Sequence, residues 1–239
     1  MIAVDAPITE QAETIDRVWN LFLGLGLVVL LLVAGLMLWV IVRYRKRPTD
    51  GPLHLPPQKH YNIPMEITYI VIPLVIVLGL FAVTFVTVDA IDDDDPDPDL
   101  VVDVIAFQWQ WQFDYPDSSV SITGKPGENP ELVLPASSTV RFDLTALDVI
   151  HSFWIPAFRF KRDMIPGTPG SFRVDVADVA GYYPNSGVCA EFCGLDHSSM
   201  RFSVRILPRD EFDQWLSEQP VADQPVTDQP VTGTEEEGT

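Results

Sequence analysis

Sulfur, histidine and lysine are scarce in this chain of 239 residues, which holds two cysteines, four histidines and only four lysines. The sequence contains no C-x-x-C-H motif, which excludes covalent attachment of a c-type haem through that motif. Basic residues are few as well, because 15 lysines and arginines stand against 34 acidic residues and leave a net charge of −19. The N-terminus is acidic and lacks the basic region of a signal peptide, so we expect no cleavable leader in the sequence as it stands.

The acidic excess is confined to the C-terminal part of the chain. Before Asp89 there are six acidic and six basic residues, whereas from Asp89 onward there are 28 acidic and nine basic residues. The densest run is Asp-Asp-Asp-Asp-Pro-Asp-Pro-Asp at 92–99. Like charges and prolines do not pack into a core, so we expect a solvated acidic linker at 89–99.

Two long uncharged runs lie in the N-terminal part. Residues 19–42 form 24 positions without a charge, enough for a helix to cross a hydrocarbon core of about 30 Å. Residues 67–88 form a second run of 22 positions, interrupted by Pro73 and Gly79, which membrane helices tolerate. The sequence therefore predicts a two-helix transmembrane anchor over 19–88.

The flanking charges predict the orientation of this anchor. Cytoplasmic loops are enriched in lysine and arginine, and five such residues lie between the two runs: Arg43, Arg45, Lys46, Arg47 and Lys59. We expect loop 43–62 to be cytoplasmic, and segment 1–18 and the C-terminus to lie outside a prokaryotic cell membrane. Glu66 lies at the cytoplasmic end of the second run, where a carboxylate needs water or a partner, or is favoured by a helix N-terminus.

Residues 100–207 have the pattern of an all-β domain. Runs of strand length alternate or stay apolar at 100–107, 139–147, 171–176 and 201–207, and turn-forming residues separate them. An antiparallel Greek-key sandwich follows from this spacing. Residues 208–218 predict a short amphipathic helix, and 219–239 carry Gln-Pro-Val at a period of five, which is typical of a disordered tail.

Both cysteines lie within one stretch of twelve residues, with the spacing C-x3-C-x3-H-x2-M. Its four side chains are Cys189, Cys193, His197 and Met200, and His151 lies some forty residues upstream. Thiolate, imidazole and thioether ligands together favour copper over calcium or magnesium. A structural zinc site or a disulfide remains possible at this point, although zinc has little use for methionine and a Cys189–Cys193 disulfide would close a very small loop.

Several motifs together resemble subunit II of cytochrome c oxidase, from the first span to about Pro208. They are Phe-Gln-Trp-Gln-Trp at 107–111, Asp-Val-Ile-His-Ser-Phe-Trp-Ile-Pro at 148–156, Lys-Arg-Asp-Met-Ile-Pro-Gly at 161–167, and Gly-Tyr-Tyr at 181–183 followed by the cysteine stretch. The resemblance implies a cupredoxin-like Greek-key β-sandwich or barrel, with the metal loop between its last two strands. The chain departs from the family at Thr168, where many members have arginine.

The resemblance also implies a dinuclear copper centre, called CuA, at these residues. In it Cys189 and Cys193 bridge both coppers, His151 and His197 each bind one, and Met200 is a weak axial ligand of one copper. The carbonyl oxygen of Glu191 serves the other copper. The Glu191 side chain has a second role in the family, as ligand of Mg²⁺ or Mn²⁺ at the boundary with subunit I.

Roles outside the metal loop are implied as well. Trp109 is the expected point where electrons arrive from the donor, with Trp111 behind the metal loop, and alternation along a strand would point both to one face. Glu66 matches the mouth of a proton pathway in the partner subunit. Asp114, Asp117 and Asp148 match positions that dock cytochrome c by opposed charge. A small blue-copper protein is an alternative donor, because such acidity is also typical of adaptation to high salt, where attraction is screened.

The expected function is that of the electron-accepting subunit of a proton-pumping haem–copper oxidase. It takes electrons at CuA and passes them to haem in subunit I, because this chain has no haem-binding motif of its own. Subunit III is a further expected partner. Three alternatives stay open: subunit II of a quinol oxidase, which lacks the copper ligands, a CuA subunit of a nitric oxide reductase, and a membrane-anchored copper carrier.

Overall fold

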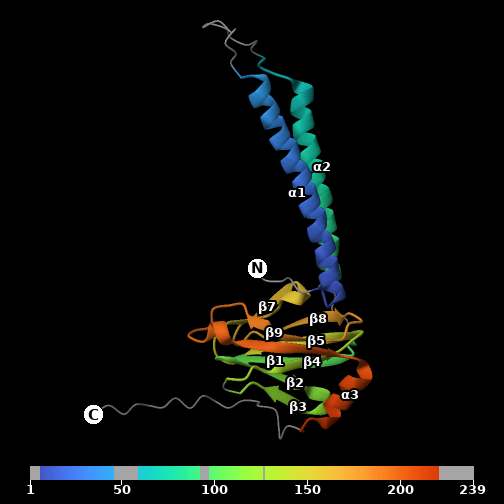
Figure 1. Ribbon diagram of the computed structural model, residues 1–239, viewed down its shortest axis with the longest axis vertical. Helices are drawn as coiled ribbons and strands as arrows, with labels where there is room; N and C mark the ends of the chain where they lie inside the picture. The colour runs from blue at the N-terminus through green and yellow to red at the C-terminus, as the bar shows by residue number, and fades with distance from the viewer. Residues whose placement is uncertain (1–5, 46–58, 92–96, 126, 221–239) are drawn as a thin grey trace, which may run out of the picture. The chain divides into compact units, whose positions relative to one another are not determined.

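The computed structural model describes residues 6–45, 59–91, 97–125 and 127–220 (Figure 1). The chain divides into two units, one formed by Glu13–Asp92 and one by Met1–Ala12 together with Asp93–Thr239. The middle of the predicted cytoplasmic loop, residues 92–96 of the acidic linker and nearly all of the repeat tail lie outside the described residues.

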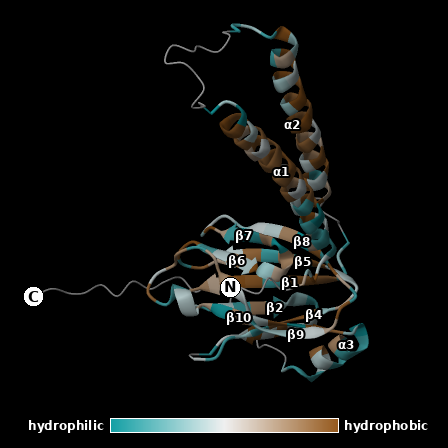
Figure 2. Ribbon diagram, turned by 45° about the horizontal axis from the view of Figure 1, so that its top comes forward, coloured by the Kyte–Doolittle hydropathy of each residue, from teal (hydrophilic) through white to brown (hydrophobic). Residues whose placement is uncertain are grey.

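The first unit contains two helices, α1 (Glu10–Arg43), whose first three residues belong to the second unit, and α2 (Ile63–Ile91). Both are long and apolar enough to cross a membrane, and hydrophobic residues make up most of their length (Figure 2). Most of their large apolar side chains are exposed. They contain the two predicted spans and extend beyond them. Asn62 and Glu66 cap the start of α2: Asn62 Oδ1 accepts from the N–H of Met65, and Glu66 Oε1 accepts from the N–H of Asn62.

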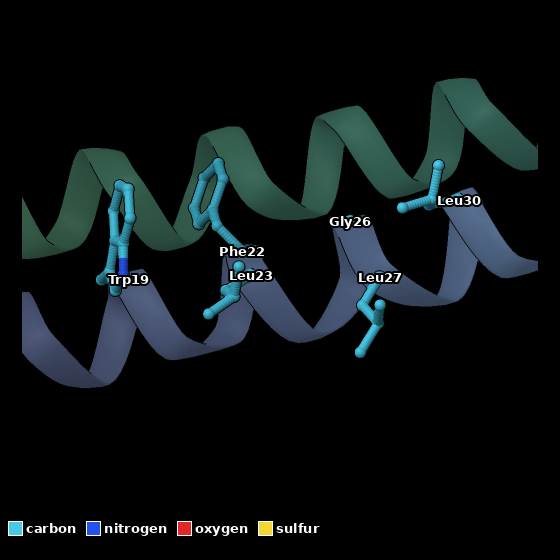
Figure 3. A pocket seen from close by; sticks show the side chains of 6 residues that line it. All are labelled: Trp19, Phe22, Leu23, Gly26, Leu27 and Leu30. Atoms are coloured by element: carbon cyan, nitrogen blue, oxygen red, sulfur yellow. The ribbon is translucent and has the colours of Figure 1, made fainter.

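An apolar hollow of about 360 Å³ lies on one face of α1. Gly26 leaves a gap among larger side chains, which are Trp19, Phe22, Leu23, Leu27 and Leu30 (Figure 3). A surface of this kind is compatible with lipid, because hydrocarbon side chains at membrane depth have no polar groups to satisfy.

The second unit is a sandwich of two five-stranded sheets (Figure 1). The first sheet has the order β3 (Val120–Thr123), β2 (Gln110–Tyr115), β1 (Leu100–Phe107), β5 (Ser138–Ala146) and β8 (Gly170–Val176). The second has the order β4 (Glu131–Pro135), β10 (Arg201–Leu207), β9 (Gly181–Cys189), β6 (His151–Ile155) and β7 (Phe160–Met164). The predicted order, two long apolar helices followed by an all-β sandwich, is confirmed.

The expectation of a wholly antiparallel sandwich is wrong for two strand pairs. β1 pairs with β5 and β10 pairs with β4 in parallel register. Parallel neighbours need a crossover connection. The chain supplies one when it leaves the first sheet after β3, runs through β4 in the second sheet, and returns as β5.

The core lies between the two sheets. Buried and half-buried residues alternate along β1, so that apolar side chains enter the core while Asp103 faces outward. Aromatic rings from both sheets meet inside, and Phe202 of β10 contacts Trp111, Phe113 and Phe153 at centroid distances of 5.3, 5.2 and 5.1 Å. Burying each such ring contributes about 1.5–3 kcal/mol, which makes this packing the main source of stability for the unit.

Segments at both ends of the chain pack onto the sandwich. Thr9 forms a bridge with Val176 at the edge of β8, and the side chain of Gln11 exchanges two hydrogen bonds with Asp175. α3 (Arg209–Glu218) buries Phe212 beside Tyr115. The N-terminal contact covers the open edge of a sheet and was not expected from the sequence.

Candidate metal centre

Two neighbouring strands and the loop after them carry the metal-ligand candidates. His151 begins β6 and Cys189 ends β9, and the register of these strands pairs Phe153 with Cys189. The chain then turns through Cys193 and the short helix η3 (His197–Ser199) and reaches Met200 directly before β10. Because β9 pairs with β10, this loop returns to the place where it began.

The donor atoms of these residues converge on one point. The Sγ atoms of Cys189 and Cys193 are 3.8 Å apart, and both thiols are free. His151 Nδ1 lies 3.8 Å from Cys189 Sγ, and His197 Nδ1 lies 3.6 Å from Cys193 Sγ.

Two weaker donors lie beside the sulfurs. The Met200 Sδ atom is 3.7 Å from the Sγ of Cys193, and the carbonyl oxygen of Glu191 is 3.2 Å from the Sγ of Cys189. Each sulfur therefore has one imidazole and one weak donor near it. Two thiols, two imidazoles and a thioether form a soft donor set that fits copper, and no disulfide links the cysteines.

The centre is largely closed to solvent. His151 is 0% exposed, Cys189 6%, Cys193 3% and Met200 1%, while His197 is half-buried. The ligand atoms of His151, Cys189 and Cys193 all lie within 4.8 Å of one another. Ionisable groups buried together in a core are usually paired with one another or bound to a metal, so the geometry of this set is that of a candidate metal site.

The ionisation of the cysteines and histidine is mutually coupled. Burial opposes the charged form of Cys189, but hydrogen bonds with His151 and backbone N–H groups outweigh it and lower the pKa of the Cys189 thiol. Burial and the neighbouring Cys189 sulfur raise the pKa of Cys193. Burial lowers the pKa of His151, yet its bonds with Cys189 and Asp148 outweigh burial and raise it.

Backbone hydrogen bonds hold the metal loop. The N–H of Cys189 donates to the carbonyl of Met200, and the N–H of Ala190 donates to the carbonyl of Ser152, both at 3.0 Å. The buried Ser152 hydroxyl donates to Asp163 at 2.7 Å. Asp163 lies in the 161–167 motif, but its contact beside the metal loop was not predicted, because a strand carboxylate reads as a surface residue.

Gly194 fits where a larger residue would not. Its φ is +118°, a conformation that L side chains rarely adopt, and a Cβ would lie 3.1–3.2 Å from the side chains of Gln108 and Trp109. These two side chains both donate to the carbonyl of Cys193, Gln108 Nε2 at 2.7 Å and Trp109 Nε1 at 3.1 Å. The turn between β1 and β2 is thereby tied directly to the metal loop.

The expectation that Trp109 and Trp111 share one face of a strand is wrong. Trp109 lies in the turn between β1 and β2, and only Trp111 belongs to β2. Trp109 is half-buried and lines a polar hollow of about 690 Å³ together with Asn129, Asn185 and Arg201. Trp111 is fully buried, with its ring centroid 6.4 Å from that of His151.

The three aspartates expected to dock a donor lie in different surroundings. The carboxylate of Asp148 contacts His151, with Oδ1 at 2.8 Å from Nε2. Asp114 faces outward on β2, where Gln112 and Ser121 donate to it. Asp117 is exposed in the short helix η1 (Pro116–Ser118), after the end of β2 remote from Trp109.

The two glutamates with expected roles differ in their surroundings. Glu191 is exposed in the metal loop, and only its backbone carbonyl lies against the centre. Glu66 belongs to the helical unit, where its carboxylate caps α2. The capping bond accounts for a carboxylate at this position without reference to a proton pathway.

Comparison with known proteins places the chain in a family. A protein-family model described as "Cytochrome C oxidase subunit II, periplasmic domain" matches residues 127–207. The "Probable cytochrome c oxidase subunit 2" of Streptomyces avermitilis is 34% identical over 255 residues, covering 91% of this chain and 78% of the relative. The "Cytochrome c oxidase subunit 2" of Mycobacterium bovis is 30% identical over 267 residues, covering 89% and 73%.

A solved structure gives a partial match. The periplasmic domain of subunit II of cytochrome oxidase from Bradyrhizobium japonicum is 31% identical, covering 51% of this chain and 94% of that chain, with a TM-score of 0.45. The identity and coverage of the curated relatives are sufficient on their own: the chain belongs to the cytochrome c oxidase subunit 2 family.

Proposed function

We propose that this chain is the electron-accepting subunit of a haem–copper oxidase, anchored in a prokaryotic cell membrane with both termini outside. Membership of the family makes it a subunit of an oxidoreductase complex. The single observation that carries the finer proposal is the pairing of donors: two free sulfurs 3.8 Å apart, each with its own imidazole and its own weak donor. A copper carrier or a zinc site does not account for this two-fold arrangement.

The donor set would supply every ligand of a dinuclear copper centre. Cys189 and Cys193 would bridge two coppers, and His151 and His197 would each bind one. Met200 and the carbonyl of Glu191 would complete the two sides as weak ligands. When bound, copper held by bridging thiolates takes up and releases one electron with the charge spread over metals and sulfurs.

The protein's own contribution is to hold these ligands still. His151 and Cys189 lie at the ends of paired strands, and the loop that bears the remaining ligands is closed by a backbone bond between Cys189 and Met200. Ligands that barely move between charge states keep the cost of electron transfer low. Burial of the sulfurs also excludes water from the site.

Trp109 provides a path from the surface to the metal loop. Its indole ring lines the polar hollow, and its N–H donates to the carbonyl of Cys193. We assign it the receipt of electrons from cytochrome c or a small blue-copper protein, with Asp114 and Asp117 contributing to the attraction of a basic donor. The hydrogen bond from Trp109 to the carbonyl of Cys193 connects the aromatic ring in that hollow to the residue that carries one of the two sulfurs.

The partner roles complete the proposal. The exposed carboxylate of Glu191 is free to bind Mg²⁺ or Mn²⁺ at a boundary with the haem-bearing subunit I, because a hard cation prefers oxygen ligands. Glu66 is assigned to the mouth of a proton pathway in that partner, in addition to its capping bond. Subunit III is a further expected partner, and oxygen is reduced outside this chain.

Substitution of one bridging sulfur tests the proposal. We expect the wild-type chain, purified with its partners from native membranes, to hold two copper ions and a multiline mixed-valence electron paramagnetic resonance spectrum. Cys193→Ser should lose that spectrum and donor oxidation while circular dichroism shows an unchanged sandwich. Ser198→Ala, an exposed residue of the same loop, is the matched control and should keep both. A wild-type chain with one copper ion, or a mixed-valence spectrum in Cys193→Ser, would contradict the proposal.

A further inference from the structure

The carboxylate of Asp148 is engaged on both oxygens inside the chain. Asp148 lies between β5 and β6, three residues before His151. Its Oδ1 is 2.8 Å from His151 Nε2 and accepts from the N–H of Val149 at 2.6 Å, and its Oδ2 accepts from the N–H of Gln108 at 2.6 Å. Asp117, by comparison, has no side-chain hydrogen bond within the part of the chain that the structure describes.

These bonds determine which nitrogen of His151 faces the sulfurs. An ionised carboxylate only accepts hydrogen bonds, so Nε2 of His151 must carry the proton. In the neutral ring the lone pair then lies on Nδ1, which faces Cys189 Sγ at 3.8 Å. His151 is fully buried, so bulk water does not compete for the hydrogen bonds of either ring nitrogen.

We propose that Asp148 is a positioning residue that orients His151 for metal binding and joins it to the turn bearing Trp109. This inference rests on the proposed copper centre. A carboxylate bonded to the outer nitrogen of a metal-binding imidazole fixes the ring and raises its basicity. The bond from Asp148 to the N–H of Gln108 extends the same support to the residue before Trp109, so one side chain holds both the ligand and the start of the electron path.

The second imidazole has no equivalent support among the described residues. His197 is half-buried, its Nδ1 faces Cys193, and its ring contacts Phe192 at a centroid distance of 5.8 Å. Asp196, its neighbour in sequence, is exposed and its carboxylate makes no hydrogen bond in the described chain. Asp148 therefore makes His151 the stronger donor of the two, and the two sides of the centre should be electronically unequal.

The test compares Asp148→Asn and Asp148→Ala with Asp196→Asn in the full chain. Asn keeps the size and one acceptor but removes the charge, whereas Ala removes all three bonds. We expect copper affinity to fall about 10- to 100-fold in Asp148→Ala and less in Asp148→Asn. We also expect the reduction potential to rise in both, because the lost negative charge favoured the oxidised centre, and the nitrogen hyperfine couplings of the two histidines to become more alike. Asp196→Asn removes a charge beside the other imidazole and should change none of these.

A copper-free measurement separates this inference from the proposed function. Nitrogen-15 resonances of histidine in the metal-free, detergent-solubilised chain should show His151 with its proton on Nε2, and a mixture of tautomers in Asp148→Ala. That result supports the positioning role even if the wild-type chain fails to form a mixed-valence centre, which would overturn the proposed function alone. An unchanged tautomer in Asp148→Ala, or equal shifts of potential in Asp148→Asn and Asp196→Asn, would overturn the positioning role. If Asp148→Ala fails to fold, Asp148→Asn decides by its potential and hyperfine couplings.

Discussion

The close approach of β9 to Phe202 leaves no room for a side chain at Gly187. The two residues are paired across the strands, and a Cβ at position 187 would lie 2.1 Å from two ring carbons of Phe202. The ring has no free direction to move, because Trp111 and Phe153 pack against it at centroid distances of 5.3 and 5.1 Å. Gly187→Ala therefore pushes Phe202 toward Trp111, which itself packs against His151.

The expected loss of stability follows from two opposed contributions. Overpacking a filled core costs about 1–3 kcal/mol. Alanine in place of glycine within a strand returns about 0.5–1 kcal/mol through backbone entropy. The two ranges combine to a net loss of about 0–2.5 kcal/mol, and because Phe202 is packed on both faces we expect about 1–2 kcal/mol. For a domain of this size each kcal/mol lowers the melting temperature by roughly 4 °C. We expect near-ultraviolet circular dichroism of the detergent-solubilised chain to show unfolding about 4–8 °C below wild type.

Matched variants make this prediction refutable. Gly170→Ala is the control, because Gly170 also lies in a strand, β8, and nothing lies within 4 Å of its added Cβ. It should melt at or slightly above the wild-type temperature. In a Phe202→Leu background, Gly187→Ala should cost less than it does alone, because the ring that it strikes is gone. An unchanged melting temperature in Gly187→Ala, or an equal cost in both backgrounds, would show that the contact with Phe202 is not the cause.

Three further variants test charge, a buried hydroxyl and the electron path. Asp103 pairs with an aspartate on each neighbouring strand, and burial first, then these charges, raise its pKa above the ordinary 3.8. The folded state therefore binds this proton more tightly than the unfolded state, so Asp103→Asn should add about 0.2–1 kcal/mol at pH 7. Melting temperatures measured over a range of pH should show the extra stability of Asp103→Asn vanish as the pH falls through the raised pKa to below 3.8. Extra stability that does not depend on pH would contradict this explanation. Tyr115→Phe should lower the free energy of unfolding in urea by about 1–3 kcal/mol. The buried Tyr115 hydroxyl donates to the carbonyl of Val133 in β4 and accepts from its N–H, and both bonds are lost. A loss under about 0.5 kcal/mol would contradict this reasoning. Trp109→Phe should slow electron uptake in stopped-flow measurements without loss of copper, and an unchanged rate would remove its assigned role.

Local patterns in the sequence predict much of this fold. β1 and β10 have the predicted bounds, because alternation along a strand directly reflects which side chains enter the core. The two spans are predicted by length and lack of charge alone. The metal loop is equally visible, since four of its ligand candidates lie within twelve residues and need no tertiary information to be grouped.

Contacts between distant segments are what the sequence does not reveal. The parallel pairing of β1 with β5 depends on the crossover through the second sheet, which leaves no mark on either strand. Residues 8–12 attach to the edge of β8, although their composition is that of an exposed segment. Asp148 is the one charged residue of loop 147–150 and was expected to dock a donor, and nothing in that loop indicates that it bonds a turn 40 residues away in the chain.

The arrangement of these distant contacts explains why a soft metal loop is built on this sandwich. The turn of Gln108 and Trp109 connects two strands of the first sheet, whereas the ligand candidates belong to strands of the second sheet and the loop between them. The carbonyl of Cys193 is therefore held by side chains of the other sheet. A loop bonded only to its own sheet would move with that sheet alone. Here any shift of one sheet against the other must break bonds at the metal loop, so the packing of the aromatic core also restrains the ligands. For the proposed electron-transfer site, that restraint would matter more than the strength of any single bond, because each redox step would then begin and end with nearly the same ligand positions.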